Sequence, residues 1–233
     1  MSSRTNTTAP LGYSVWFVGI VALFLTSLLT ANLIASKVVS IAGLVVPAGI
    51  IIFPISYIVG DVLTEVYGYR RARRVIWFGF GCNLLMVLAI QVAIALPPAP
   101  DWKLQEAYAQ ILGATPRLLI ASFAAYLFGE FSNAFVLAKM KILTQGRWLW
   151  TRTIGSTLVG QAFDSAIFCT LAFVGVVPPV VLLNMILTQW LAKSAYEALA
   201  TPLTYLVVGF LKAREGIDVY DYETRFNPFM LEE

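Results

Sequence analysis

Long apolar stretches alternate with short polar ones along most of the chain. A helix must supply roughly 20 mostly apolar residues to cross a bilayer core that is about 30 Å thick. Six stretches are long enough, and they predict six spanning helices over residues 13–36, 48–66, 75–96, 116–138, 153–176 and 179–211. Pro47, Gly49 and Pro54 crowd the start of the second, where a short re-entrant approach is an alternative. Pro202 predicts a kink, a tilt or an extension in the sixth.

The composition supports lipid as the solvent. Of 233 residues, 59% are hydrophobic and only 12% are charged, whereas a soluble domain is nearer 45–50% apolar and about 25% charged. The polar start and the length of the first apolar stretch indicate a retained span and no cleavable signal peptide. We therefore predict an all-α membrane protein: a cytoplasmic segment over 1–12, a six-helix bundle over 13–212 and a solvated cytoplasmic tail over 213–233. A small interfacial helix is expected in the loop 97–115.

The basic residues predict the orientation. Lys and Arg accumulate on the cytoplasmic side of membrane proteins. With the N-terminus inside, 12 of the 16 basic residues lie on the inner side, including Arg70, Arg71, Arg73 and Arg74. This asymmetry predicts that both termini are cytoplasmic and that the protein resides in the cell inner membrane.

Missing residue types exclude several functions. The chain has no histidine, so Ser-His catalysis, histidine metal sites and histidine proton relays are excluded. Cys82 and Cys169 lie far apart in apolar stretches, which argues against a metal site or a redox pair. No Walker motif or Gly-rich phosphate loop is present. We expect no cofactor and no metal ion, and no ATP-driven pumping by this chain alone.

Polar side chains recur at helical spacing inside four predicted spans. An ionisable group near the centre of a span costs roughly 2.5–3.5 kcal/mol on insertion scales, so such groups usually face the bundle interior and serve a pathway or a ligand. The acids Asp61, Glu130, Asp164 and Glu197 outnumber the interior lysine, Lys193. In a common cavity, the excess negative charge would require a proton or a cationic ligand. The stripes are Tyr57, Asp61 and Glu65; Glu130 and Asn133; Gln161 and Asp164; and Gln189, Lys193 and Glu197.

A purely structural role remains an alternative for each single residue. Interhelical polar contacts are worth only about 0.6–2 kcal/mol each, so any one amide could be structural. Lys193 and Glu197, four residues apart, could neutralise each other on one helix. Glu65, nearer the inner end, could pair with the arginines of 70–74. The aromatic residues near the stripes could stack on a flat heterocycle: Phe53, Tyr57, Phe163 and Tyr196.

Several blocks of the sequence resemble one family. The most specific is PAGIIIFPISYIVGDVLTEVYGYRRAR at residues 47–73, preceded by ANLIASK at 31–37. EFSNAFVLAKMK at 130–141, RTIGSTLVGQAFDSAIF at 152–168 and KSAYEALATPLTY at 193–205 follow in order. Together they resemble the queuosine precursor transporters within the vitamin uptake transporter family, over about residues 31–212.

The resemblance implies a six-helix secondary-type transporter that imports 7-cyano-7-deazaguanine and 7-aminomethyl-7-deazaguanine for queuosine salvage. A carboxylate could accept bonds from the ring N–H and the exocyclic amine of such a base, and an amide or a lysine could donate to its carbonyl. Asp164 with Gln161 is therefore the first candidate for binding the edge of the base, and Glu130 with Asn133 is the second. The other candidates are Gln189 and Lys193 as donors, and Asp61, Glu197 and Glu65 for charge balance or coupling.

Two alternatives belong to other classes. The chain could be the substrate-binding subunit of an ATP-driven importer. It could also be an intramembrane aspartyl protease using Asp61 and Asp164, although Ile58 stands where a GxGD motif requires its first glycine. No nucleic acid is expected as a partner, and no sequence signal decides for or against a homodimer.

Overall fold

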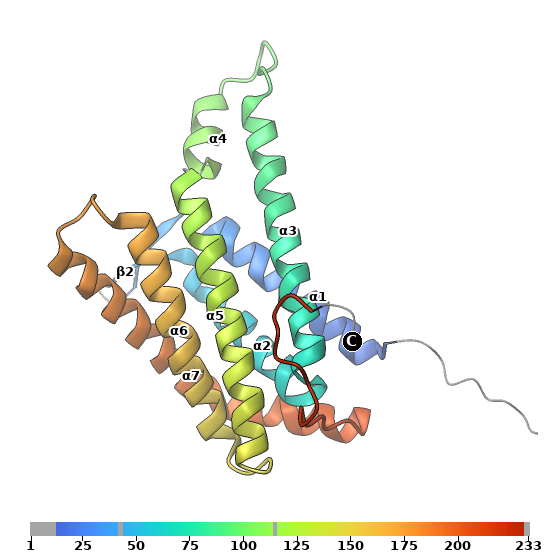
Figure 1. The fold of residues 1–233 in the computed structure, drawn as a ribbon. Coiled ribbons are helices and arrows are strands. Elements are labelled where there is room, and N and C mark those ends of the chain that lie inside the picture. Colours follow the sequence, from blue (N-terminus) through green and yellow to red (C-terminus); the bar gives the residue numbers. More distant parts are fainter. Residues whose placement is uncertain (1–12, 42–43, 114–115, 231–233) are drawn as a thin grey trace, which may run out of the picture.

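The computed structural model describes residues 13–41, 44–113 and 116–230. In this part of the chain, six helices of 15 to 37 residues form a bundle, joined by one short helix and one β-hairpin (Figure 1). The helices are α1 (Val15–Ile34), α2 (Phe53–Tyr67), α3 (Tyr69–Ala95), α4 (Gln105–Leu112), α5 (Pro116–Leu143), α6 (Leu149–Phe173) and α7 (Pro179–Glu215).

Four of these stretches are long and apolar enough to cross a membrane: α1, α3, α6 and the stretch Gln105–Leu143, which contains α4 and α5. The predicted all-α membrane fold is confirmed to this extent. The other two predicted spans coincide with helices α2 and α7, which are too short or not apolar enough to be counted with these four. The 15 residues of α2 reach only about 22 Å at a rise of 1.5 Å per residue. The apolar run of α7 is interrupted by Gln189, Lys193 and Glu197.

A β-hairpin precedes α2, where the sequence left a re-entrant approach open. Strands β1 (Val38–Ile41) and β2 (Leu44–Pro47) pair antiparallel, and a 3-10 turn, η1 (Ala48–Ile51), leads into α2. Pro54 stands in the first turn of α2, a position where its missing N–H costs no helical hydrogen bond. The hairpin was not predicted. The helix predicted in the loop 97–115 is confirmed as α4.

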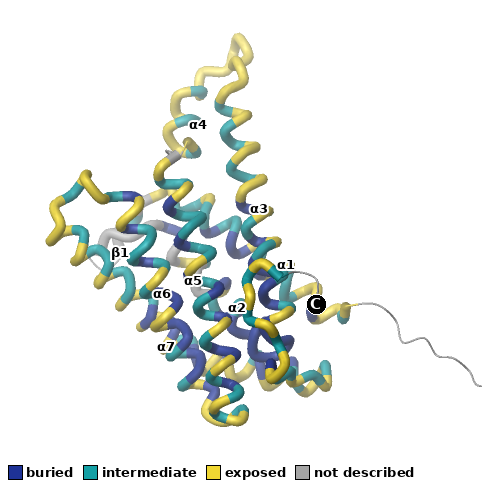
Figure 2. Tube along the Cα trace, viewed as in Figure 1, coloured by how far each residue is buried: buried dark blue, intermediate teal, exposed yellow. Residues whose placement is uncertain are grey.

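Helix α2 is the centre of the bundle. It packs against α1, α3, α5 and α7, and its residues Val62, Glu65 and Val66 are completely buried. Figure 2 shows the buried residues gathered around α2 and the neighbouring parts of α5, α6 and α7, while α4 and the loop before it are exposed. A polar stripe on an enclosed helix must find its partners on the surrounding helices.

Helices α5 and α6 make the closest helix contact. Gly129 and Gly160 lie at their crossing: a Cβ on Gly160 would lie 2.9 Å from the carbonyl oxygen of Gly129. Small residues at such crossings let helix backbones approach closely in a membrane. Asn133 and Asp164 lie directly beside the crossing. The atom nearest to a Cβ on Gly160 would be the Cβ of Asn133, and the atom nearest to a Cβ on Gly129 would be the Cβ of Asp164. The two glycines therefore set the positions of two predicted site residues.

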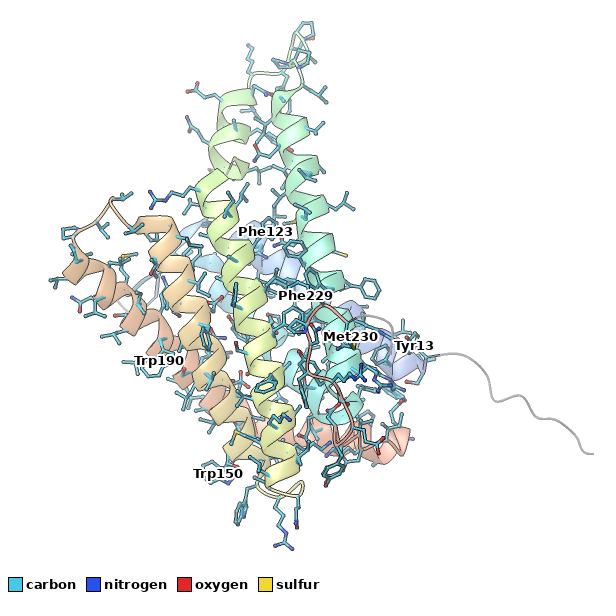
Figure 3. The ribbon with its side chains drawn as sticks, in the orientation of Figure 1. Tyr13, Phe123, Trp150, Trp190, Phe229 and Met230 are labelled. Carbon is cyan, nitrogen blue, oxygen red and sulfur yellow. The ribbon has the colours of Figure 1, made fainter. Side chains whose placement is uncertain are left out.

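The residues after α7 fold back onto the bundle. The backbone N–H of Tyr69 donates to Asp221 Oδ2 at 2.9 Å, and Trp77 Nε1 donates to the carbonyl of Pro228 at 2.7 Å. Figure 3 shows Phe229 lying over α3, where its ring is 5.9 Å from that of Trp77. Residues Gly216–Met230, which we call the C-terminal strap, are therefore docked on the bundle, although seven of the fifteen remain exposed to solvent.

The strap could not be inferred from charge alone, because its attachment is made largely by backbone groups. Arg73, which is fully buried, donates to the carbonyls of Arg225 and Asn227 at 3.1 and 2.7 Å. Gly68, between α2 and α3, has a φ of +85°, and a Cβ there would lie 2.7 Å from Val219 Cγ1. Both the left-handed backbone and the contact with the strap favour glycine at this position.

Candidate functional site

The stripe on α2 divides the polar interior into three layers, because Tyr57, Asp61 and Glu65 lie one helical turn apart. Glu65 faces basic residues of α5, α6 and α7. Asp61 faces α5, with Glu197 of α7 close enough to interact with it electrostatically. Tyr57 faces α6 and α7. We call these the Glu65 layer, the Asp61 layer and the Tyr57 layer.

The Glu65 layer is a buried ion network. Arg152 of α6 holds the Glu65 carboxylate in two bonds of 2.7 Å, from Nε to Oε2 and from Nη2 to Oε1. Lys212 of α7 donates to Oε1 at 2.7 Å, and Lys141 of α5 lies 3.7 Å from the same atom. The structure thus gives Glu65 partners on three other helices instead of the neighbouring arginines 70–74. Glu65 fastens the end of α2 to α5, α6 and α7.

The strap joins this network through Asp218. Lys141 Nζ donates to Asp218 Oδ1 at 2.5 Å and to the carbonyl of Val219 at 2.7 Å, and Lys212 Nζ lies 2.9 Å from the same carboxylate oxygen. Partial burial by itself raises the pKa of the Asp218 carboxyl, but the hydrogen bonds from Lys141 and Lys212 outweigh it and hold the pKa below its usual value. Asp218 is therefore ionised at neutral pH.

The Asp61 layer has acids and no cation of its own. Asn133 Nδ2 donates to Asp61 Oδ1 at 2.7 Å. Asp61 Oδ2 and both carboxylate oxygens of Glu197 are buried without a hydrogen-bond partner among the described residues. Glu130 of α5 acts electrostatically on Asp61 as well. Acids of three helices, α2, α5 and α7, therefore lie near one another in this layer, as predicted.

The Tyr57 layer joins α2, α6 and α7. Lys193 of α7 forms an ion pair with Asp164 of α6. The lysine thus pairs with an acid on another helix and not with Glu197, which is on the same helix. Tyr57 donates from its hydroxyl to Gln161 Oε1 at 3.4 Å, and both members of the ion pair act on it electrostatically. The side chains of Lys193 and Asp164 keep 28% and 19% of their surface exposed. These two side chains are therefore less enclosed than Asp61 and Glu197, which are each 1% exposed.

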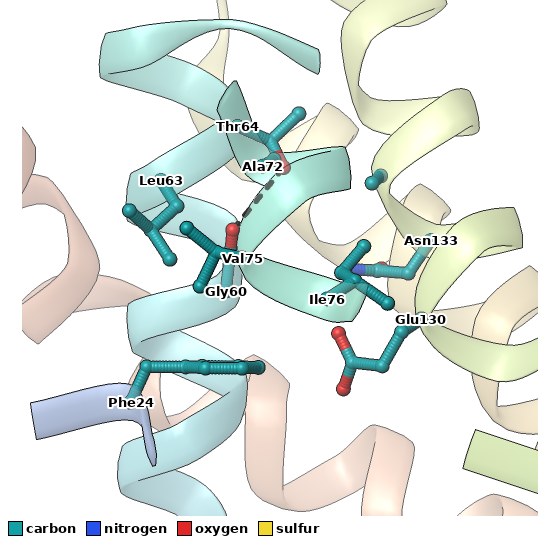
Figure 4. A pocket seen from close by; sticks show the side chains of 10 residues that line it. Phe24, Gly60, Leu63, Thr64, Ala72, Val75, Ile76, Glu130 and Asn133 are labelled. Carbon is teal, nitrogen blue, oxygen red and sulfur yellow. Dashed lines mark hydrogen bonds between the residues drawn. The ribbon is translucent and has the colours of Figure 1, made fainter. Parts of the chain in front are cut away.

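A small cavity lies on the α1 side of Glu130. It has a volume of about 10 Å³ and is lined by residues of α1, α2, α3 and α5. Figure 4 shows Phe24 and Glu130 projecting into it from opposite sides, with the Thr64 hydroxyl bonded to the carbonyl of Gly60. A volume of 10–15 Å³ is about that of one water, whereas small-molecule sites are usually about 300–1,000 Å³. The cavity beside Glu130 therefore has room for about one water and not for a base, although Glu130 keeps part of its own surface exposed.

The aromatic candidates are divided between the interior and the surface. Tyr57 is half-buried beside the ion pair. Phe163 and Tyr196 are 47% and 43% exposed, and Phe163 lines an apolar groove of about 500 Å³ that also contains Phe131 and Phe226. The side chain of Phe53 lies outside the described residues. Of the three aromatic candidates whose side chains are described, Tyr57 is the one that contacts the polar layers.

Several residues of the site were missed by the sequence interpretation. Lys141, Arg152 and Lys212 entered it only as markers of the inner side, yet Lys141 and Arg152 are almost completely buried. Phe24 was read as part of an apolar span. A usable signal was present for Arg152, which directly precedes a predicted span and lies nine residues before Gln161 on the same helix. Gln189 is half-buried on α7, one turn from Lys193.

Comparisons with known proteins match most of the chain. The family model described as "Putative vitamin uptake transporter" matches residues 47–207. A "Probable queuosine precursor transporter" of Bacillus subtilis (strain 168) is 33% identical over 176 residues, which cover 75% of this chain and 77% of that protein. A "Queuosine precursor transporter" of Escherichia coli (strain K12) is 28% identical over 144 residues, 62% of each chain. No solved structure matches the chain.

The family match covers well over half of the chain, and it includes all three polar layers up to Glu197. The resemblance stated from the sequence blocks is confirmed. The aspartyl protease alternative is set aside, since the relatives are transporters. This chain belongs to the vitamin uptake transporter family, the family of the queuosine precursor transporters, and is a multi-pass membrane transporter and not an enzyme.

Proposed function

We propose that the protein imports 7-cyano-7-deazaguanine and 7-aminomethyl-7-deazaguanine by a secondary-type mechanism, with a binding site in the Tyr57 layer. The observation that carries the proposal is the Lys193–Asp164 ion pair, which lies between α6 and α7 beside Gln161 and Tyr57. The printed names of the two relatives support the substrate class.

The groups of this layer match the polar edge of a deazaguanine. The ring N–H and the exocyclic amine are donors, and the Asp164 carboxylate can accept from both. The carbonyl of the base needs a donor, which Lys193 or the Gln161 amide supplies. In the structure these groups satisfy one another. The substrate therefore competes with an existing ion pair, and only a ligand that replaces both sets of bonds binds well.

Glu130 and Asn133 form the second part of the proposed site. Glu130 takes part in no ion pair among the described residues, so it can neutralise the cationic aminomethyl group. The cavity beside it has room for about one water. The helices around Glu130 must separate before a base can approach it, and we propose that α2 moves relative to α5 in this step.

The orientation and the number of spans belong to the same proposal. We propose six spans with both termini in the cytoplasm, with the Glu65 layer at the inner end and the hairpin at the outer end. The basic-residue asymmetry supports this arrangement. On this view α2 crosses the membrane together with η1, within the shelter of α1, α3, α5 and α7. The strap then closes the inner end.

Uptake by the purified protein in liposomes tests the proposal. Labelled 7-cyano-7-deazaguanine should accumulate without a partner protein, and Asp164→Asn and Glu130→Gln should each reduce uptake at least tenfold, because each removes a charged hydrogen-bond partner worth about 1.5–3 kcal/mol. Glu106→Gln on the exposed surface of α4 is the matched control. Normal uptake by both interior variants at equal protein amounts would show that the site lies elsewhere. A requirement for an added ATPase would favour the subunit alternative.

A further inference from the structure

The basic residues of the interior are all engaged outside the Asp61 layer. Lys193 pairs with Asp164. Arg152, Lys141 and Lys212 pair with Glu65 and Asp218. No ion pair in the described part of the chain includes Asp61 or Glu197. Among the described residues, Asp61 and Glu197 are thus two neighbouring buried acids that take part in no ion pair.

The two acids of this layer are deeply buried and belong to different helices. Asp61 of α2 and Glu197 of α7 are each 1% exposed. Glu197 exerts the strongest electrostatic effect on Asp61 of any charged group, followed by Glu130 and Glu65, and all three are acids. The oxygens without partners are Asp61 Oδ2, Glu197 Oε1 and Glu197 Oε2. Asn133, the one amide bonded to Asp61, also has an unpaired Oδ1.

A proton is the occupant that suits this set of atoms. Two ionised carboxylates cannot be stably buried together without a cation, because the loss of hydration and their mutual repulsion add up. The described residues contain no group of three or more acid or cysteine side chains placed to hold a metal ion. A carboxyl group that binds a proton becomes a hydrogen-bond donor, and one shared proton would supply a donor for an oxygen that now lacks one.

We propose that Asp61 and Glu197 form a proton-binding site that couples transport to the proton gradient. The inference rests on the proposed transport function and adds its driving force. Glu197 lies one turn from Lys193 on α7, and Asp61 lies one turn from Tyr57 on α2. Both acids of the proton site are thus neighbours of the proposed substrate layer on the same helices.

The link between the two layers is a competition for Lys193. With the proton bound, Glu197 is neutral and Lys193 pairs with Asp164, as in the structure. Loss of the proton leaves Glu197 charged at the i+4 position from Lys193, where an ion pair on one helix is favourable. Lys193 then turns toward Glu197, and the proposed site loses a donor for the carbonyl of the base, so the substrate is released. Proton binding and substrate binding therefore favour each other at this pair of layers, as import driven by an inward proton gradient requires.

Transport assays in liposomes separate coupling from binding. For the wild type, an inward proton gradient should stimulate net uptake of labelled 7-cyano-7-deazaguanine, whereas counterflow exchange at equal pH should not need the gradient. Glu197→Gln, which imitates the protonated carboxyl, should lose the stimulation and keep exchange. Asp61→Asn should do the same, and Glu106→Gln should behave as wild type.

A second measurement needs no variant. Substrate binding to the detergent-solubilised wild type should take up protons from a weakly buffered solution that contains a pH dye. Full gradient stimulation in both variants, loss of exchange in folded Glu197→Gln protein, or binding without proton uptake would each overturn the proton site. Absence of both uptake and exchange in the wild type would instead overturn the transport function itself, so the two failures are distinguishable.

Discussion

Gly129 of α5 and Gly160 of α6 meet so closely that each backbone occupies the space in which the other would place a side chain. A Cβ on Gly129 would lie 3.3 Å from the carbonyl oxygen of Gly160 and 2.9 Å from Asp164 Cβ. A Cβ on Gly160 would lie 2.7 Å from Asn133 Cβ. The crossing therefore fixes the spacing of α5 and α6 and positions Asn133 and Asp164 at the same time.

Gly160→Ala should weaken both stability and transport. The added methyl group meets backbone and Cβ atoms that cannot rotate away, and overpacking of this kind costs about 1–3 kcal/mol. We expect a lower unfolding temperature in detergent and a lower rate of substrate uptake. Gly81→Ala on α3 is the control, because a Cβ there meets nothing within 4 Å. Equal effects of the two substitutions would contradict the close crossing.

Glu65→Gln should be among the most destabilising substitutions in the bundle. It would leave Arg152 and Lys141, both almost completely buried, without their shared carboxylate, and removal of one partner from a buried ion pair costs about 3–5 kcal/mol. The unfolding temperature of the purified protein measures the loss. Asp101→Asn in an exposed loop should change it little. A small effect of Glu65→Gln would mean that water reaches this network.

The Lys193–Asp164 pair should show strong coupling in a double-mutant cycle. Lys193→Gln alone leaves Asp164 partly buried without its cation, and Asp164→Asn alone leaves the lysine in the same condition. The double variant removes both charges, so it should be more stable than the sum of the single effects implies, with an interaction energy within about 0.5–3 kcal/mol. Unfolding temperatures of the four proteins give this energy. Additive effects would mean that the two residues do not interact.

Loss of strap contacts should expose the C-terminal residues to protease. Trp77→Phe removes the 2.7 Å bond to the Pro228 carbonyl while keeping an aromatic ring. Combined with Asp221→Asn, which removes the charge that accepts from the Tyr69 N–H, it should raise the rate of cleavage after residue 216 severalfold. Tyr222→Ala is the control, since this side chain is 67% exposed. Unchanged cleavage would show that the strap is held by other contacts.

Acid should loosen the strap only well below neutral pH. The pKa of Asp218 is lowered in the folded protein by Lys141 and Lys212, so its contribution is complete above the ordinary aspartate pKa of about 3.9. The contribution is lost as the pH falls through the lower, folded value. Because Asp218 is 42% exposed, solvent screens the effect. Acid-stable protease digestion should show constant cleavage above about pH 5, and Asp218→Asn should remove the acid-dependent part.

The sequence predicts the interior of this protein better than its ends. Helical spacing placed Tyr57, Asp61 and Glu65 on one face of α2, and the structure gives each its own layer. Spacing on one helix cannot reveal which residue of another helix lies opposite. The Lys193–Glu197 pair suggested by a four-residue step is thus replaced by Lys193–Asp164. The predicted Lys193–Glu197 pair depended on spacing along one helix, whereas the Lys193–Asp164 pair depends on how α6 and α7 pack against each other.

The strap and the hairpin were missed for a different reason. The hairpin is held by backbone pairing, and several strap contacts are accepted by backbone carbonyls, as from Arg73 to those of Arg225 and Asn227. Every residue type carries a carbonyl, so composition gives no signal for such contacts. The polar, mixed charge of residues 216–230 is typical of a solvated segment, and docking of that segment depends on the surface that the folded bundle presents to it.

The order in which the chain is made gives the Glu65 network a consequence for assembly. Ribosomes deliver residues from the N-terminus at about 5–20 per second, so α2 reaches the membrane long before α6 and α7. Glu65 is therefore made without Arg152 or Lys212, which complete its coordination in the finished protein. The nascent chain carries an unbalanced acid until Lys141 of α5 and Arg152 of α6 have been made. Lys212 of α7 is the last partner to be added, so we expect the native packing around Glu65 to be completed only after the final helix has been made.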